Sequence, residues 1–168
     1  MVGPVPASWE IDPQLAGARL VVPGVWRLRL PTAWDGIDHA NAWAVEAEDD
    51  GIVLFDCGSA GHPSYEEALE RALEQAGHTI EDVRLLVATH VHSDHIGLAK
   101  LVIERAGAEL WAHPDDAHFY DGTREPERIA AARTRRAIAE GVPASRLDAL
   151  CNTREETEGV LAAVAPHR

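Results

Sequence analysis

Four side chains of the types that bind metal ions lie within six residues of this sequence: His90, His92, Asp94 and His95. Imidazole nitrogen and carboxylate oxygen together suit a borderline divalent ion such as zinc. His90 and His92 alternate along the chain, so both can converge on one ion. Asp94 and His95 can then reach a second ion nearby, and Gly97 allows a tight turn into a following helix. The motif therefore predicts a metal site with room for two ions.

The chain has two cysteines, Cys57 and Cys151, and neither lies in this motif. They have no framework spacing, which argues against a disulfide-stapled secreted domain. A closed structural zinc site would more often use cysteine ligands. Cys57 follows Asp56 at a predicted strand end, and we expect it to be a small buried residue. The histidine motif is therefore more typical of a reactive metal site than of a structural one.

The motif directly follows a predicted buried strand, and a loop that leaves a strand end can point several side chains at one spot. Apolar patterns predict strands at 25–30, 41–47, 52–55, 84–89 and 109–112, with a loop at 31–38. Helical periodicity predicts helices at 63–76 and 96–105, and helical stretches near 115–120, 126–140 and 154–164. This order predicts an α/β layered domain with one sheet face still to be covered.

The composition narrows the class of protein. The chain has 168 residues, of which 46% are hydrophobic and 26% charged, as in a single globular domain. The formal net charge of −13 disfavours nucleic acid and anionic membranes as partners. We find no signal peptide and no apolar stretch of membrane-spanning length in the sequence. A soluble, cytoplasmic protein that acts on a small molecule is the expectation.

Residues 41–45 and 53–58 form a predicted strand pair that ends in an Asp-X-Gly turn, and Thr89 and Gly97 flank the histidine motif. Together with His-X-His-X-Asp-His, these features resemble the metallo-β-lactamase fold superfamily. The resemblance covers about residues 20–120 and implies an αββα sandwich. Because His95 follows Asp94, the sequence resembles the binuclear hydroxyacylglutathione hydrolases, ribonuclease Z and lactonases within that superfamily.

The resemblance implies a role for each residue of the motif. His90 and His92 would bind the first metal ion, and Asp94 and His95 would bind the second. Asp56 would support these ligands by accepting a hydrogen bond and orienting them. The ions would be two Zn²⁺ per complete site, with iron or manganese as alternatives. Asp94 would also act in catalysis as a proton acceptor.

The sequence lacks other ligands that the resemblance implies. A third histidine for the first ion, a bridging carboxylate and a last histidine normally come from the C-terminal half. Here the sequence after residue 120 has one histidine, His167, next to its end. Earlier in the chain, His113 and His118 are weak alternative ligands, and His39 is a candidate for lining the cleft.

We therefore interpret the chain as the N-terminal portion of the sandwich plus a helical segment. Residues 1–18 are predicted as an irregular lead-in, and 19–120 as the N-terminal half of a metallo-β-lactamase-like domain. Residues 121–168 are predicted as the helical segment, a candidate lid.

Three functions follow as alternatives. The first is a metal-dependent hydrolase that activates water on two ions and hydrolyses a small ester, thioester or lactone. The second is a phosphodiesterase or nuclease of the same fold, which the acidic balance disfavours. The third is an incomplete metal-binding fragment that is inactive on its own or self-associates as an oligomer to cover its sheet.

Overall fold

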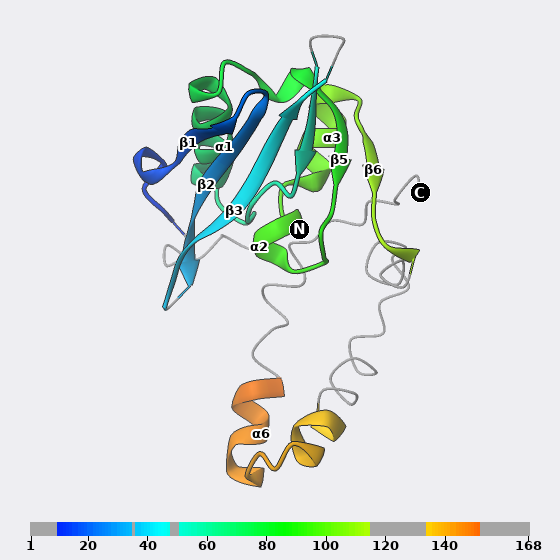
Figure 1. Ribbon diagram of the computed structural model, residues 1–168. Coiled ribbons are helices and arrows are strands. Elements are labelled where there is room, and N and C mark those ends of the chain that lie inside the picture. The colour runs from blue at the N-terminus through cyan, green and yellow to red at the C-terminus, as the bar shows by residue number, and fades with distance from the viewer. Residues whose placement is uncertain (1–9, 35, 48–50, 115–133, 152–168) are drawn as a thin grey trace.

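The computed structural model describes residues 10–34, 36–47, 51–114 and 134–151. Within these residues six strands form one sheet, in the order β1-β2-β3-β4-β5-β6 (Figure 1). The strands are β1 (Gly17–Val22), β2 (Val25–Trp34), β3 (Ile37–Glu46), β4 (Ile52–Phe55), β5 (Val83–Val87) and β6 (Glu109–Trp111). A short 3-10 helix, η2 (Pro13–Leu15), precedes β1. The prediction of an α/β fold is confirmed.

The strand direction changes in the middle of the sheet. Neighbouring strands from β1 to β4 are antiparallel, whereas β4, β5 and β6 are parallel. Parallel strands need crossover connections. These are α1 (Pro63–Gln75) with η3 (Ile80–Asp82), and then α2 (Ser93–Ile96) with α3 (Ala99–Ala106). The carboxyl ends of the three parallel strands therefore meet at one edge, where α/β proteins commonly bind ligands.

Helices α1 and α3 pack against the same face of the sheet (Figure 1). The cross-strand neighbours Ala44, Leu54, Leu86 and Leu110 point toward them and are fully buried. From α1 the core receives Ala68, Leu69, Ala72 and Leu73. Full burial of one such leucine stabilises the fold by about 1.5–3 kcal/mol. The strands that carry the motif are thus held on a rigid base.

The helix predicted at 63–76 is confirmed as α1, and its ends follow from local chemistry. His62 caps its start, because the His62 Nδ1 accepts a hydrogen bond from the Ser64 N–H at 3.2 Å. Pro63 fits the first turn, where its missing N–H has no intrahelical acceptor. The helix ends before Gly77, whose φ of 85° is favourable only for a residue without a Cβ.

In two places the strands differ from the prediction. β1 lies partly in the predicted lead-in and partly in unassigned sequence. Leu20, Val21 and Val22 are consecutive apolar residues, so the sequence shows no alternation of apolar and polar residues that would indicate a strand. All three are exposed in the structure. The loop predicted at 31–38 is wrong, because β2 and β3 continue to pair as far as Trp34 and Ile37.

The helix predicted at 96–105 corresponds to α3, which begins at Ala99, and the separate helix α2 was not predicted. Residues 134–139 are helical, within the stretch predicted at 126–140. Helix α6 (Ala144–Cys151) was not predicted. The stretches predicted at 115–120 and 154–164, and most of the candidate lid, lie outside the described residues. Among the helices that the structure describes, none is long and apolar enough to cross a bilayer.

Candidate metal centre

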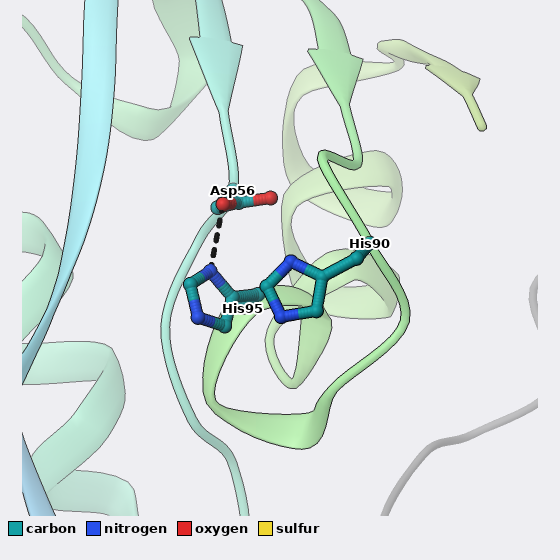
Figure 2. A group of neighbouring side chains, drawn as sticks. All are labelled: Asp56, His90 and His95. Atoms are coloured by element: carbon teal, nitrogen blue, oxygen red, sulfur yellow. Dashed lines mark hydrogen bonds and ion pairs between the residues drawn. The ribbon is translucent and has the colours of Figure 1, made fainter. Parts of the chain in front are cut away.

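The predicted motif lies at the carboxyl ends of β4 and β5. Asp56 follows β4, His90 follows β5, and α2 carries Asp94 and His95. Two backbone contacts join the loops: the Cys57 N–H donates to the His95 carbonyl at 2.6 Å, and Gly58 pairs with Ile96. Segments about forty residues apart in sequence are thereby brought side by side (Figure 2).

Asp56 is held in a backbone conformation that is unusual for a residue with a Cβ. Its φ is 61°, in the left-handed region, and the residue is 3% exposed. Its N–H donates to the Val87 carbonyl at 2.9 Å, which ties it to β5. Such conformations cluster at functional sites, because the surrounding structure must offset their cost. The backbone conformation of Asp56 directs its buried carboxylate toward the histidine loop.

The Asp56 carboxylate accepts three hydrogen bonds. The Thr89 N–H donates to Oδ1 at 2.8 Å, and the Thr89 hydroxyl donates to Oδ2 at 2.7 Å. The Nδ1 of His95 lies 2.7 Å from Oδ2 (Figure 2). Because a carboxylate can only accept, His95 donates from Nδ1 and keeps the lone pair of Nε2. The hydrogen bond to Asp56 also raises the pKa of His95.

Thr89 connects Asp56 to His90 and so fixes the tautomer of His90 as well. Its hydroxyl hydrogen is used on Asp56, so its oxygen accepts from the His90 Nδ1, which lies 3.0 Å away. His90 therefore also keeps its lone pair on Nε2. Partial burial, with a further contribution from the neighbouring His95 and His92, lowers the pKa of His90. A neutral imidazole with a free Nε2 is the form that binds a metal ion.

The first pair of candidate ligand atoms is the Nε2 of His90 and the Nδ1 of His92. They lie 3.2 Å apart. Two nitrogens that bind one tetrahedral zinc at about 2.05 Å stand about 3.3 Å apart. The spacing of this pair therefore fits a shared ion.

The second pair is the Oδ2 of Asp94 and the Nε2 of His95, which lie 3.5 Å apart. One tetrahedral zinc with ligands at about 2.0–2.2 Å would set an oxygen and a nitrogen about 3.4 Å apart. Asp94 is 7% exposed, and its Oδ1 is buried without a hydrogen-bond partner in the described part of the chain. A buried carboxylate oxygen without a donor is costly unless a cation faces it. The spacing of the Asp94 Oδ2 and the His95 Nε2 therefore fits a second divalent ion, whose charge would also offset the burial of this carboxylate.

Candidate ligand atoms of Asp56, His90 and His95 also lie within 4.8 Å of one another (Figure 2). Asp56 nevertheless fits poorly as a direct ligand. Its carboxylate already accepts three hydrogen bonds, and the 2.7 Å contact with His95 has the length of a charge-assisted hydrogen bond. The contacts instead match a residue that orients the ligands, as is common around metal-bound histidine.

Gly97 serves the site differently from the prediction. A tight turn was expected there, but its φ of −55° and ψ of −44° are ordinary helical values. What the position lacks is space. A Cβ on Gly97 would lie 2.4 Å from the Ala60 nitrogen and 2.6 Å from the Ser59 carbonyl carbon. The glycine lets α2 approach the loop after Asp56.

Neither His39 nor His113 belongs to the two candidate ligand pairs. His39 is on β3, and its Nδ1 is buried without a hydrogen-bond partner among the described residues. His113 follows β6 at the same edge and is exposed. His118 and His167 lie outside the described residues. The sequence did not predict that Thr89 links Asp56 to His90. The position of Thr89 directly before His90 was its one indication in the sequence.

The chain is similar to proteins of one family. The model of the metallo-beta-lactamase superfamily matches residues 35–161. Metallo-beta-lactamase domain-containing protein 1 of Mus musculus is 36% identical over 104 residues, which cover 56% of this chain and 39% of that protein. The rat protein of the same name is 35% identical over 95 residues, covering 51% of this chain and 37% of that protein.

Solved structures agree. A metallo-beta-lactamase family protein from Thermus thermophilus has a TM-score of 0.62 and 28% identity, covering 89% of this chain and 45% of that one. BJP-1, a subclass B3 metallo-beta-lactamase of Bradyrhizobium japonicum, has a TM-score of 0.53 and 18% identity, covering 71% and 40%, which shows the likeness of fold alone. The chain spans less than half the length of each of these relatives. It belongs to the metallo-beta-lactamase superfamily.

Proposed function

We propose that this chain carries metal ligands of a hydrolase centre. His90 and His92 would hold one divalent ion, and Asp94 and His95 would hold a second. Family membership supports a metallohydrolase. The observation that carries the assignment of residues is the spacing of the two atom pairs, 3.2 Å and 3.5 Å. Zinc suits these nitrogen and oxygen donors, with iron or manganese as alternatives.

The chemistry of such a site follows from its parts. A divalent ion supplies Lewis acidity and lowers the pKa of water. Asp56 fixes the tautomer of His95 directly and that of His90 through Thr89. The Oδ1 of Asp94 has no hydrogen-bond donor among the described residues, so Asp94 is the candidate proton acceptor for a leaving group. Small esters, thioesters and lactones are the proposed substrates.

Metal content tests the ligand assignment. Purified protein, dialysed against zinc and then against buffer, is analysed by inductively coupled plasma mass spectrometry. His90→Ala and His95→Ala should each lose bound zinc. His62→Asn is the matched control. Position 62 lies outside both ligand pairs, and asparagine can also cap α1. Equal zinc in all four proteins would rule out these histidines as ligands.

Activity is tested on a panel of thioesters, lactones and phosphodiesters. The proposal predicts turnover of an acyl substrate that is lost on chelation, returns with zinc, and is absent in Asp94→Asn. Turnover that survives complete removal of metal would contradict the metallohydrolase proposal. Turnover of phosphodiesters alone would overturn the proposed substrate class and leave the metal assignment standing.

A further inference from the structure

Cys57 is a buried side chain beside the candidate metal centre that the proposed chemistry does not use. It directly follows Asp56 at the end of β4, is 0% exposed and belongs to the hydrophobic core. The side chains whose candidate ligand atoms gather at the centre are those of Asp56, His90 and His95, and the thiol is not among them. Any role of Cys57 at the centre therefore lies in contacts that position other residues.

Cys57 is tied at two points to the segment that carries Asp94 and His95. Its N–H donates to the His95 carbonyl at 2.6 Å. Its sulfur accepts a hydrogen bond from the Leu98 N–H. Leu98 directly precedes α3 and is buried, and N–H groups at the start of a helix have no acceptor within that helix. The two contacts thus hold both ends of the short connection from His95 to Leu98.

The contacts of residues 56–58 follow one another along this segment. The Asp56 carboxylate accepts a hydrogen bond from the His95 ring (Figure 2), and Gly58 pairs with Ile96. The bond to the Cys57 sulfur reaches farthest along the chain, to the point where α2 gives way to α3. Helix α2 has four residues, and a helix this short has little stability of its own. Its position therefore depends on such tertiary contacts.

We propose that Cys57 is a positioning residue for the second metal ion and that it acts through α2. This inference rests on the proposed function, because it takes Asp94 and His95 as the ligands of that ion. The candidate ligand atoms of this pair lie 3.5 Å apart on α2, and the sulfur holds the end of that helix. His90 precedes α2 and is oriented through Thr89 instead. Loss of the sulfur should therefore weaken binding of the second ion more than binding of the first.

Two substitutions separate the hydrogen bond from the packing of the side chain. Cys57→Ala removes the acceptor of the Leu98 N–H, whereas Cys57→Ser keeps an acceptor there. Amide hydrogen exchange of the metal-free protein, followed by NMR, measures the bond itself. Relative to the amides of β2, the Leu98 amide should exchange about tenfold faster in the alanine variant and near the wild-type rate in the serine variant. Equal exchange in the wild type and the alanine variant would overturn the proposal.

Metal binding by the 168-residue chain is measured by titration with Co²⁺, whose visible absorption depends on its ligands. Cys57→Ala should lower the affinity for one of the two ions about tenfold or more, as the loss of supporting contacts does, and Cys57→Ser should restore it. The affected ion is identified in combined variants. Added to His90→Ala, the alanine substitution should have its full effect. Added to His95→Ala, which lacks the second ion, it should change the remaining affinity less than about twofold.

Val83→Ala is the matched control for lost packing. Val83 is buried at the amino end of β5, so its truncation should lower stability and leave both ion affinities unchanged. Cys57→Val lacks the acceptor but fills the space, so it should bind metal as the alanine variant does, and circular dichroism checks that each variant is folded. A wild-type chain without a second ion would overturn both the proposed function and this inference. Two ions in the wild type, with Cys57→Ala weakening both or neither, would overturn the role of Cys57 alone.

Discussion

At the scale of single residues, Asp56 governs the candidate metal centre. It accepts a hydrogen bond from His95 and two from Thr89, and the Thr89 hydroxyl faces His90. The direction of each hydrogen bond follows from a carboxylate that cannot donate. Both histidines are thereby left with a lone pair on Nε2. One buried carboxylate thus prepares ligands for both proposed ions.

Asp56→Asn should lower zinc affinity about 10–100-fold, the usual effect of losing such a supporting contact. Asparagine tolerates the left-handed backbone conformation of this position, so the fold should remain. Competition with a chromophoric chelator measures the affinity. Asp12→Asn, at the cap of η2, is the control. Loss of all zinc with an intact fold would instead indicate that Asp56 is a ligand.

Two substitutions of Thr89 separate the effect of its hydroxyl on the orientation of His90 from the effect of its packing. Thr89→Val keeps the shape but removes the hydroxyl that joins Asp56 to His90, whereas Thr89→Ser keeps the hydroxyl. We expect weaker zinc binding in the valine variant and near wild-type binding in the serine variant. Chelator competition at one fixed pH measures both. Equal affinities in the two variants would show that the hydroxyl does not orient His90.

The four motif residues were predicted from their types and spacing, and their candidate ligand atoms lie in two close pairs. The role of Asp56 was implied by the family resemblance alone. The link through Thr89 could not be predicted, since it depends on the side-chain conformations of three residues from two loops. The sequence therefore indicates which residues form the candidate site, but not which of them donate and which accept the hydrogen bonds between them.

At the scale of elements, the centre depends on how closely α2 approaches the loop after β4. Gly97 makes this approach feasible, because the space for a Cβ is filled by the backbone of Ser59 and Ala60. Backbone atoms cannot rotate away as a flexible side chain can. The pairing of Gly58 with Ile96 lies at the same junction.

Gly97→Ala should therefore destabilise the chain by about 1–3 kcal/mol, as overpacking does. It should also weaken zinc binding, since α2 carries Asp94 and His95. Urea unfolding measures the first effect. Gly17→Ala is the control, because a Cβ there meets one side-chain atom at 3.4 Å. Equal stability of the two variants would contradict the proposed role of the close approach.

Elements with strong periodicity were predictable. α1 has a regular apolar face and clear end signals, and β4 is a short apolar run. β1 was missed, because three consecutive exposed apolar residues show no period, and its pairing with β2 defines it. Helix α2 was missed because three of its four residues belong to the His90–His95 motif, which has no apolar period that would indicate a helix.

At the scale of the whole molecule, metal binding should stabilise the fold. One ion at a hundred times its dissociation constant adds about 2.7 kcal/mol to the stability of the folded chain. For a chain of this size we expect each bound ion to raise the Tm by roughly 5–10 °C. Differential scanning calorimetry with and without zinc measures the shift. A variant with both His90→Ala and His95→Ala should show no shift, and an undiminished shift would place the ions elsewhere.

The ligand assignment is tested most directly by anomalous diffraction from crystals grown with zinc, measured on both sides of the zinc absorption edge. We predict one peak within about 2.1 Å of the His90 Nε2 and the His92 Nδ1. We predict a second peak in contact with the Asp94 Oδ2 and the His95 Nε2, with Asp56 bound to neither ion. A peak coordinated by the Asp56 carboxylate, or no peak at the motif, would contradict the ligand assignment.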